Sequence, residues 1–368
     1  MRVLVTGANG FVGKNLIAHL SERDGVSFTQ FSRSDSIEDL SSLVSKSDAI
    51  VHLAGANRPV DESDFYNVNV HLTDILCENI KQNSRKIPLI FASSTQAELD
   101  NPYGRSKAAA EALIERLFDE TGNPVLIYRL TNVFGKWCKP NYNSVVATFC
   151  HNIVNELPIS IDDSSKILRL VYIDDVIEHF FDAIERGSAG ISRPIVQPEY
   201  SVSVGDLAQQ LQAFKTGRAT LQTGRVGLGF GRALYATYTS HLDYDQFSYE
   251  VPRHSDERGV FVEMLKTLDS GQISYFTAFP GVVRGGHYHH SKTEKFLVIK
   301  GYAKFGFRNV ITDETRQLRV SGKESRIVES APGWSHDITN VGEEEMVVLL
   351  WANENFDPDS PDTINYKV

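Results

Sequence analysis

Three residues in the first third of the chain, Ser94, Tyr103 and Lys107, have the types and spacing needed for proton transfer. Tyr103 and Lys107 lie four residues apart at a predicted helix start, so their side chains project from one face. An ammonium beside a phenol favours the phenolate, and Tyr103 could then give or take a proton near neutral pH. Ser94 follows the apolar run 87–92, a predicted buried strand, and its hydroxyl would emerge at the carboxyl end of that strand. Such Tyr-x-x-x-Lys pairs also occur by chance on surface helices, so the surrounding elements must decide.

A second group of reactive side chains lies in the last third of the chain. His287 and His289 are two residues apart on a predicted strand and therefore face the same side. Glu294 begins the next predicted strand, and His336 follows a tight turn at Pro332-Gly333. Three imidazoles and a carboxylate that converge inside a small barrel would bind a divalent metal such as zinc or iron. His336 is the least secure of these four predicted ligands.

The first strand and the glycines that follow it predict a dinucleotide site. Residues 2–6 form a short β-branched strand that runs into Gly7-Ala8-Asn9-Gly10-Phe11-Val12-Gly13 and an amphipathic helix. Glycines permit a tight turn and close approach of the backbone to a pyrophosphate, while the helix start supplies N–H groups. The candidate contacts are Gly7, Asn9, Gly10, Phe11 and Gly13.

The next two strands refine the cofactor prediction. A strand over 26–31 ends in Ser32-Arg33, and an arginine at this position suits the 2′-phosphate of NADPH. In the alternative, Arg33 is solvated and the nearby Asp35 binds the ribose of NADH. A buried strand over 48–53 ends at Leu53, Ala54 and Gly55, a turn of small residues against which a cofactor could lie.

The pattern of elements changes once along the chain. Alternating strands and helices in the first part predict an α/β fold with a doubly wound parallel sheet. After residue 250, short strands with period-two alternation predict an antiparallel all-β fold. Between 217 and 249 the helical pattern decays into glycine-rich and tyrosine-rich sequence. We therefore expect two domains, 1–243 and 247–368.

Composition narrows the class of protein. A chain of 368 residues is too long for one ordinary core, and a net charge of −10 argues against nucleic acid as the main partner. Three scattered cysteines suit reduced thiols and not a disulfide framework. The first residues form a strand and not a signal peptide, and no apolar run reaches membrane-spanning length. These features predict a cytoplasmic protein that does not bind a membrane.

The motifs of residues 1–240, taken in order, resemble the nucleotide-sugar branch of the extended short-chain dehydrogenase/reductase family. They are the glycine motif, His52 to Gly55, Ser94, Tyr103/Lys107, Asn132 to Gly135 and Val171 to Val176. The resemblance implies a Rossmann sheet in which Ser94 and Tyr103 hydrogen-bond a sugar carbonyl or hydroxyl. Lys107 would hold the nicotinamide ribose. Thr95-Gln96 stand where family dehydratases carry acidic residues, so we do not expect dehydration.

The segment after this sheet contains the candidate contacts to a nucleotide-sugar. Members of this family bind the nucleotide-sugar near residues 136–151, where this chain has aromatic, basic and amide groups. Lys136, Lys139 and Trp137 could contact phosphates and a base ring, and Asn132 lies just before them. An ordinary exposed loop is the alternative for each single residue.

The second domain resembles two groups within the cupin (jelly-roll) fold. The spacing from Gly281 to Gly301 matches the metal-binding cupin motif, which implies metal on His287, His289, Glu294 and His336. The stretches 256–263 and 281–288 resemble cupin-fold sugar-nucleotide 4-keto epimerases, in which the equivalent of His287 is the general base. There the equivalent of Arg258 contacts the diphosphate, and Glu263 closes the same motif. One imidazole cannot serve both as ligand and as base, and we favour the metal reading.

The whole chain, including residues 134–145 and 355–358, resembles the bifunctional (CapF-type) enzymes of capsular-polysaccharide synthesis. The resemblance implies C3 epimerisation of UDP-2-acetamido-2,6-dideoxy-β-L-arabino-hexos-4-ulose in a zinc-containing cupin domain. NADPH would then reduce C4 in the first domain to give the UDP-2-acetamido-2,6-dideoxy-β-L-talose precursor of capsule or O-antigen L-FucNAc. A homo-oligomer, dimer or tetramer, is also implied. The alternatives are a single-function reductase with a non-catalytic cupin and a non-enzymatic NADP-sensing protein.

Overall fold

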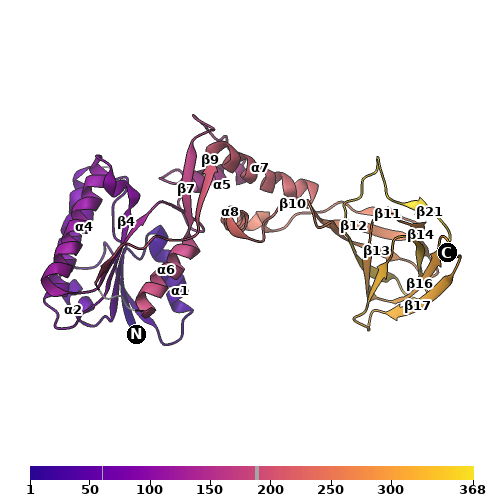
Figure 1. Cartoon of the computed structure of the whole chain (residues 1–368), viewed down its shortest axis with the longest axis horizontal. Coiled ribbons are helices and arrows are strands. Elements are labelled where there is room, and N and C mark those ends of the chain that lie inside the picture. Colours follow the sequence, from indigo (N-terminus) through magenta and orange to yellow (C-terminus); the bar gives the residue numbers. More distant parts are fainter. Residues whose placement is uncertain (60, 187–189) are drawn as a thin grey trace. The chain divides into compact units, whose positions relative to one another are not determined.

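The computed structural model describes residues 1–59, 61–186 and 190–368, and the chain divides into two compact units. Unit 1 comprises Met1–Gln212 and Gly229–Leu242, and unit 2 comprises Ala213–Leu228 and Asp243–Val368. Figure 1 shows the helices concentrated in unit 1 and the strands of unit 2 late in the sequence. The domain limits 1–243 and 247–368 stay a prediction. The structure adds that segment 213–228 packs with unit 2, a pairing that local sequence patterns do not encode.

A six-stranded parallel sheet with the order β2-β1-β3-β4-β5-β8 forms the centre of unit 1. Its strands are β1 (Arg2–Thr6), β2 (Ser27–Phe31), β3 (Ala49–His52), β4 (Leu89–Ser94), β5 (Val125–Leu130) and β8 (Ile191–Ser192). Chain order reverses between β1 and β3, and ligands bind at the carboxyl ends of strands beside such a switch point. The predicted parallel sheet is confirmed.

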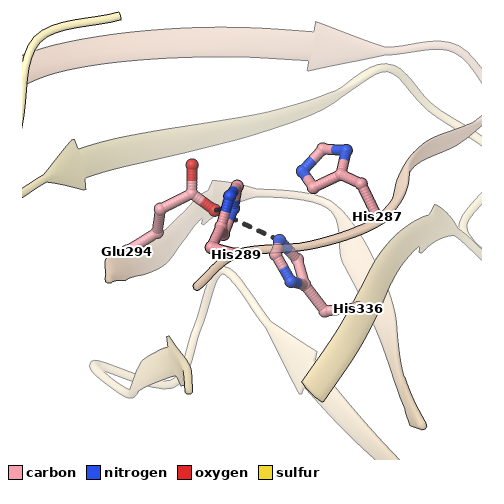
Figure 2. A group of neighbouring side chains, drawn as sticks. All are labelled: His287, His289, Glu294 and His336. Carbon is pink, nitrogen blue, oxygen red and sulfur yellow. Dashed lines mark hydrogen bonds and ion pairs between the residues drawn. The ribbon is translucent and has the colours of Figure 1, made fainter. Parts of the chain in front are cut away.

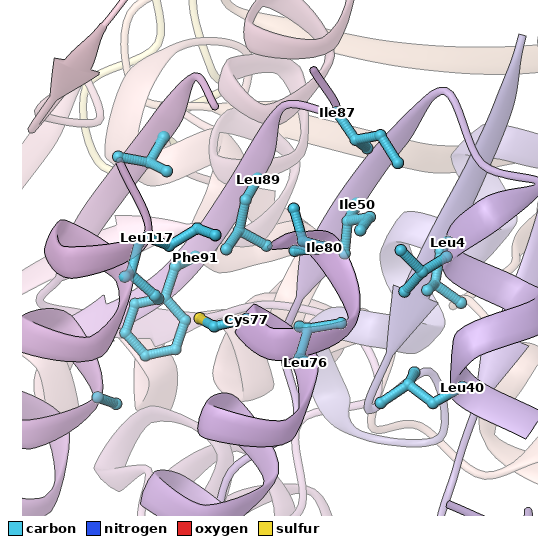
Figure 3. Packing of buried hydrophobic residues seen from close by; sticks show 14 of the residues in the cluster. Leu4, Leu40, Ile50, Leu76, Cys77, Ile80, Ile87, Leu89, Phe91 and Leu117 are labelled. Carbon is cyan, nitrogen blue, oxygen red and sulfur yellow. The ribbon is translucent and has the colours of Figure 1, made fainter. Parts of the chain in front are cut away.

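Helices cover both faces of this sheet, as expected for parallel strands buried on both sides. One face carries α2 (Asp39–Ser45), α3 (Leu72–Lys81) and α4 (Pro102–Thr121), and the other carries α1 (Phe11–Ser21) and α6 (Ile173–Arg186). Figure 3 shows Leu76 and Ile80 of α3 packed on Leu89 and Ile50 of the sheet. Each fully buried side chain of this size contributes roughly 1.5–3 kcal/mol, so this core holds α3 firmly against the sheet.

The remaining elements of unit 1 form a smaller layer. A second sheet has the order β6-β7-β9, and three helices accompany it. The elements are β6 (Asn132–Phe134), α5 (Val145–Val154), β7 (Ile167–Tyr172), β9 (Glu199–Ser203), α7 (Val204–Thr220), whose residues from Ala213 onward belong to unit 2, and α8 (Gly229–Thr239). Helix α8 lies where we expected the helical pattern to be lost. Its first turn is glycine-rich, but Ala233, Leu234, Thr237 and Tyr238 are buried at helical spacing.

Three short helices complete the described elements. A π-helix, η1 (Phe65–His71), leads directly into α3, and η2 (Thr95–Glu98) follows β4. The third, η3 (Tyr244–Phe247), begins with a capping box between Asp243 and Gln246. None of the helices within 1–59, 61–186 and 190–368 combines the length and apolar character of a membrane span.

Unit 2 consists of two sheets, antiparallel except for the short parallel pair β10–β12. The larger has the order β10-β12-β13-β20-β15-β18 with β11 beside β12, and the smaller has the order β17-β16-β19-β14-β21. The strands of the larger are β10 (Gln222–Thr223), β11 (His254–Asp256), β12 (Gly259–Thr267), β13 (Gln272–Ala278), β15 (Glu294–Lys300), β18 (Ile327–Ser330) and β20 (Met346–Ala352). Those of the smaller are β14 (Val283–Tyr288), β16 (Tyr302–Asn309), β17 (Thr315–Ser321), β19 (Trp334–Asn340) and β21 (Ile364–Asn365).

Side chains from both sheets form the core of unit 2. Phe276, Phe296 and Val348 of the larger sheet cluster with Phe305 and Ile338 of the smaller one. This packing of two antiparallel sheets agrees with the all-β prediction for the second part of the chain.

Candidate functional site

A pocket of about 860 Å³ opens at the carboxyl ends of β1, β2 and β3. Seven of the predicted cofactor contacts line it: Gly7, Asn9, Gly10, Arg33, Leu53, Ala54 and Gly55. Phe11 and Gly13 lie at the start of α1, outside the lining. The lining is mainly apolar with a few polar groups, as in most small-molecule sites.

Two glycines make the turn before α1 possible. Gly7 has φ +70°, and a Cβ there would lie 2.6 Å from the backbone nitrogen of Ala54. A Cβ on Gly13 would lie 2.4 Å from the carbonyl oxygen of Gly7. Only glycine lets the turn pack against both β3 and α1, which leaves a cradle of the kind that accepts a pyrophosphate.

A buried chain of hydrogen bonds holds the ends of β1 and β3 to the π-helix. The Asn69 carbonyl accepts from the Thr73 hydroxyl at 2.8 Å, so His52 Nε2, 2.9 Å from that hydroxyl, must donate to it. His52 Nδ1 then accepts from the Thr6 hydroxyl at 2.6 Å, and the Thr6 oxygen accepts from the amide of Ala54 at 3.2 Å. Burial lowers the pKa of His52 to about 3, which keeps the ring neutral. Sequence reasoning missed this relay.

Arg33 and Asp35, which follow β2, differ in their contacts: Asp35 accepts hydrogen bonds, whereas Arg33 is exposed. Asp35 Oδ2 accepts hydrogen bonds from the backbone and hydroxyl of Ser32, at 2.6 and 2.9 Å. Arg33 is exposed, lines the pocket and, within the described part of the chain, makes no ion pair. A cation is therefore available at this rim of the pocket, while one oxygen of the neighbouring carboxylate is already committed.

Tyr103 and Ser94 come together at the carboxyl end of β4. Ser94 is the last residue of β4, Tyr103 lies in the first turn of α4, and the two side chains are near enough for the Ser94 hydroxyl to affect the pKa of Tyr103. Asn101 caps α4 by accepting from the Gly104 amide at 2.8 Å, which sets the start of the helix and hence the position of Tyr103. The two hydroxyls predicted to contact the sugar therefore lie at the same end of the sheet, and their contact with the sugar stays a prediction.

The expected effect of Lys107 on Tyr103 is not found. Burial raises the pKa of Tyr103, and the nearby Ser94 hydroxyl opposes this shift. Lys107 Nζ instead donates to the carbonyl of Ala92 at 2.9 Å and lies 4.7 Å from the ring centroid of Phe91. Lys107 is 5% exposed, and burial lowers its pKa to about 8. The two side chains share a helix face as predicted, but the ammonium is turned toward β4.

A buried ion pair beneath this site was not expected from the sequence. Glu111 accepts from the Ser93 hydroxyl and from Arg129, whose Nη2 is 2.6 Å from Oε2. Arg129 Nη1 also donates to Glu98 of η2 at 2.7 Å. Because Ser93 precedes Ser94, and Glu111 is one turn beyond Lys107, the cluster fixes α4 against β4. The i, i+4, i+8 spacing from Tyr103 to Glu111 was the available signal.

The predicted nucleotide-sugar contacts after β6 are partly engaged within the protein. Lys136 Nζ pairs with Asp174, and the Asn132 amide donates to the carbonyl of Arg169 at 3.0 Å. Trp137 has φ +67° and a half-exposed ring. Lys139 Nζ lies 5.7 Å from the ring centroid of Tyr142. Trp137 and Lys139 are therefore open to a ligand, whereas Lys136 and Asn132 also serve the fold.

In unit 2 the four predicted metal ligands converge. Figure 2 shows His287, His289, Glu294 and His336 gathered from β14, the loop after it, β15 and β19. One candidate ligand atom from each residue lies within 4.8 Å of every other. His289, Glu294 and His336 are buried, and His287 is half-buried, which leaves one side of the group accessible.

Two consecutive glycines give β14 the bulge that turns His287 toward β19. Gly285 and Gly286 have φ +96° and +80°, and the register shifts between Gly285 and His287. A Cβ on Gly285 would lie 2.8 Å from the carbonyl of His336. Glycine is therefore required where β14 passes the ligand His336 on the neighbouring strand.

The donor set fits a divalent metal. Glu294 Oε2 lies 3.2 Å from His289 Nε2 and 3.1 Å from His336 Nε2. His289 Nδ1 donates to the backbone carbonyl of Asp362, so its Nε2 presents a lone pair to the carboxylate. Two acceptors at this distance need a cation or a proton between them. Three nitrogens and one carboxylate oxygen are the donors that zinc and iron take.

The protonation states of Glu294 and His287 favour the binding of a cation. Burial alone would raise the pKa of Glu294, but the neighbouring imidazoles of His289 and His336 and the charge of Lys292 hold it well below its ordinary value. Burial also lowers the pKa of His287 to about 4, with His336 adding to the shift. An ionised carboxylate beside a neutral His287 is the protonation state that metal ligation requires.

The two remaining candidate contacts are held in local ion pairs. Arg258 donates to Asp256 Oδ2 through Nε at 2.9 Å, and Glu263 pairs with Lys266 at 3.0 Å. Arg258 lies in the turn between β11 and β12, half-exposed, and Glu263 lies on β12. Both positions stay predictions for substrate contact.

Comparison with known proteins covers both units. Residues 3–197 match the NAD dependent epimerase/dehydratase family and residues 254–364 match the polysaccharide biosynthesis C-terminal domain. A Pseudomonas aeruginosa protein named UDP-2-acetamido-2,6-beta-L-arabino-hexul-4-ose reductase is 56% identical over 99% of this chain and 98% of that protein.

Solved structures agree with this result. The capsular polysaccharide assembling protein CapF from Staphylococcus aureus is 41% identical, covers 100% of both chains and superposes with a TM-score of 0.92. A UDP-glucuronic acid 4-epimerase from Bacillus cereus, 18% identical with a TM-score of 0.57 over 66% of this chain and 98% of that one, shares the fold alone. The chain therefore belongs to the NAD dependent epimerase/dehydratase family, in the group that carries a polysaccharide biosynthesis C-terminal domain and includes CapF.

Proposed function

We propose that unit 1 reduces the C4 ketone of a UDP-linked 4-keto-6-deoxy-HexNAc, using NADPH. The observation that carries this proposal is the 56% identity, over nearly the whole chain, to a protein named as a reductase of such a sugar. The substrate is UDP-2-acetamido-2,6-dideoxy-β-L-arabino-hexos-4-ulose or its C3 epimer. The neighbouring hydroxyls of Ser94 and Tyr103 at the carboxyl end of β4 support the same chemistry.

Tyr103 and Ser94 would have different roles in the reduction. NADPH, when bound, supplies the hydride. The Tyr103 hydroxyl donates a proton to the C4 oxygen as that oxygen gains negative charge, and Ser94 donates a second hydrogen bond to it. The raised pKa of Tyr103 keeps the phenol protonated before the reaction, as a general acid requires. Lys107 lies one turn further along α4, where its Nζ donates to the Ala92 carbonyl, and it would hold the ribose of the bound cofactor.

The choice of NADPH is supported by the end of β2. Arg33 is exposed at the pocket rim, and Asp35 accepts two hydrogen bonds from Ser32. An arginine stabilises a 2′-phosphate, whereas NADH needs a carboxylate free to bind both ribose hydroxyls. The arrangement therefore favours the phosphorylated cofactor.

We further propose that unit 2 is a cupin that epimerises the same sugar at C3. His287, His289, Glu294 and His336 would hold zinc, which when bound polarises the C4 ketone. The ketone acidifies the neighbouring C3–H, so epimerisation must precede reduction. In the alternative, His287 is itself the base, and its neutral state and partial exposure are compatible with that role.

Together the two steps would give UDP-2-acetamido-2,6-dideoxy-β-L-talose, a precursor of capsule or O-antigen sugars. We expect this chemistry in the cytoplasm, by a dimer or tetramer of the chain. The name of the Pseudomonas aeruginosa relative mentions reduction only. This favours, as a second candidate, a single-function reductase whose cupin binds sugar or builds an oligomer.

Replacement of Tyr103 tests the reductase. Tyr103→Phe should lower kcat for NADPH-dependent reduction of the 4-keto UDP-sugar by about 10²–10⁴-fold, because the C4 oxygen loses its proton donor. NADPH binding, measured by fluorescence titration, should not change. Tyr66→Phe is the matched control, since Tyr66 is 64% exposed. If the unaltered protein does not consume NADPH with this sugar, the proposed reductase is wrong.

A further inference from the structure

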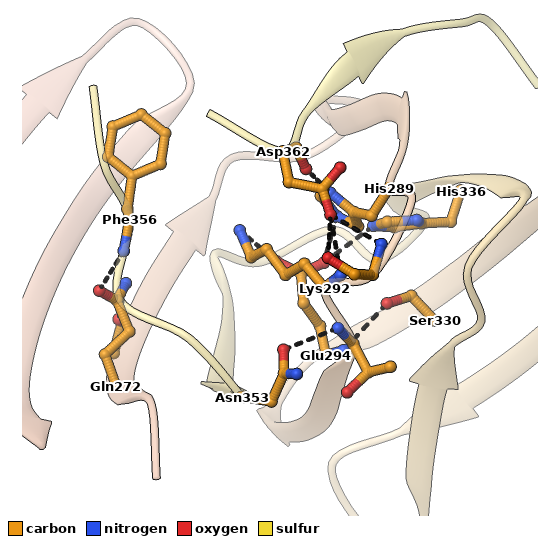
Figure 4. Close-up of polar contacts among 12 residues, drawn as sticks. Gln272, His289, Lys292, Glu294, Ser330, His336, Asn353, Phe356 and Asp362 are labelled. Atoms are coloured by element: carbon orange, nitrogen blue, oxygen red, sulfur yellow. Dashed lines mark hydrogen bonds and ion pairs between the residues drawn. The ribbon is translucent and has the colours of Figure 1, made fainter. Parts of the chain in front are cut away.

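The C-terminal segment 353–366 runs alongside the loop between the candidate metal ligands His289 and Glu294 (Figure 4). Strand β21 pairs with the end of β14, where Asn365 lies opposite His287, and the Tyr366 amide donates to the carbonyl of Gly286 at 2.9 Å. At its other end Asn353 Oδ1 accepts from the amide of Thr293 at 2.9 Å. Figure 4 shows the segment crossing beside the loop between His289 and Glu294. The loop is thus held from outside at both ends.

Asp362 is the centre of these contacts. Its Oδ1 accepts from the amide of His290 at 2.8 Å. Its Oδ2 accepts from the amides of Ser291 and Lys292, at 2.8 and 2.9 Å, and from the Ser291 hydroxyl at 3.0 Å. Three consecutive N–H groups therefore converge on one carboxylate, which fixes the loop between two ligands. Hydrogen bonds of this charge-assisted kind are stronger than neutral ones.

The backbone of the same residue reaches a ligand directly. The Asp362 carbonyl accepts from His289 Nδ1. A carbonyl oxygen has no proton to give, so this contact assigns the proton of His289 to Nδ1 and leaves Nε2 unprotonated toward Glu294 and His336. Partners of this type orient ligand imidazoles and raise their affinity for metal.

We propose that Asp362 is a positioning residue of the metal centre: its carboxylate shapes the 290–292 loop and its carbonyl selects the ligating nitrogen of His289. This inference rests on the proposed metal site. It assigns a role in that site to a residue 73 positions away from His289 in the sequence. The C-terminal segment would then be part of the metal centre and not a terminal extension.

Zinc affinity tests the inference. Asp362→Ala removes the carboxylate and releases the carbonyl that it anchors, and should weaken Zn²⁺ binding by about 10–100-fold in competition with a chromophoric chelator. The Zn²⁺ affinity of Asp362→Asn should lie between those of the unaltered protein and Asp362→Ala, because the amide N–H₂ of the asparagine would face backbone donors. The Co²⁺-loaded variants should show an altered visible d–d spectrum, since an imidazole that is no longer oriented changes the ligand field. Asp359→Ala, an exposed aspartate of the same segment, is the control.

The outcomes separate this inference from the proposed function. Equal zinc affinity and an unchanged Co²⁺ spectrum in Asp362→Ala would overturn the role of Asp362 and leave the metal site intact. If the unaltered protein binds neither ion, the metal site itself is wrong, and the inference fails with it. Unchanged NADPH affinity and an intact metal-free unfolding transition in the variant would show that a loss of zinc is not general unfolding.

Discussion

Lys107 is a charged residue in a place where charge is unfavourable. It is 5% exposed, and burial lowers its pKa from 10.5 to about 8. Between these values the unfolded chain binds the proton and the folded chain does not, so this group makes stability rise with pH from about 8 to about 10.5. Below pH 8 both states are protonated, and the cost of the buried charge is constant at about 3 kcal/mol.

Lys107→Met should therefore stabilise the cofactor-free protein at pH 7 by up to about 3 kcal/mol. The gain should shrink as pH rises and vanish near pH 10.5. Urea unfolding of both proteins at pH 7, 8.5 and 10 measures the difference, in which the titration of other groups cancels. A difference that stays constant over this range would show that Lys107 is not the group that titrates.

A substitution of Arg33 tests whether this residue selects NADPH over NADH. Arg33→Ala should raise KM for NADPH by about 10–100-fold, because the 2′-phosphate loses a charge-assisted partner, and should leave KM for NADH within a factor of two. Arg116→Ala is the control, since Arg116 is exposed and pairs with Asp74. An equal rise in both KM values would mean that Arg33 supports the fold of the pocket and does not select the phosphate.

At the scale of single residues, the sequence identified candidate residues whose positions follow from local spacing. The four metal-site residues and the pair Ser94/Tyr103 belong to this class, because each lies on a strand end or helix start that hydrophobic patterns locate. Asp362 and Glu111 were missed. Asp362 meets His289 only because the chain returns to this loop just before β21, and an aspartate in a polar tail carries no periodic signal. The turn of Lys107 toward Ala92 depends on side-chain packing, which spacing does not determine.

At the scale of elements, the turn between β1 and α1 controls the cofactor pocket. Gly7→Ala should destabilise unit 1 by about 2–4 kcal/mol, because the position combines φ +70° with a Cβ 2.6 Å from Ala54. The same change should weaken NADPH binding by at least about tenfold, since the turn must move away from β3.

Gly25 provides a matched control for this prediction. It has φ +76°, but a Cβ there would meet no atom within 4 Å. Gly25→Ala should therefore cost only the conformational term of about 1 kcal/mol and leave NADPH affinity unchanged. Thermal unfolding and fluorescence titration of both variants decide the point, and equal losses in the two would mean that close packing against β3 is unimportant.

The elements themselves were predicted well where one pattern dominates. The four strands β1 to β4 follow from apolar runs, and the start of helix α4 follows from the spacing of Tyr103 and Lys107. The π-helix η1 was not predicted, because its sequence differs little from that of an ordinary helix and its form follows from Asn69 being drawn into the core between Ala56 and Ser106. Helix α8 was missed because glycines at its start indicated a loop.

At the scale of the whole molecule, the activities proposed for the two units form a sequence. A ketone at C4 is what makes the C3 proton removable, and its reduction ends that reactivity. A chain with both proposed activities would therefore trap the epimerised sugar by reducing it. Sequence order revealed this combination, but the structure was needed to assign segment 213–228 to the all-β unit through the pairing of β10 with β12.

The most direct test of the two-step account is turnover of the 4-keto UDP-sugar with NADPH in deuterated water, followed by mass spectrometry and NMR of the product. The account predicts one deuterium at C3, inverted configuration there, a reduced C4 and equimolar loss of NADPH. Protein freed of metal by a chelator should lose the label at C3, and restored zinc should return it. Reduction at C4 with no deuterium at C3 would contradict the epimerase role of unit 2 and leave the chain a single-function reductase.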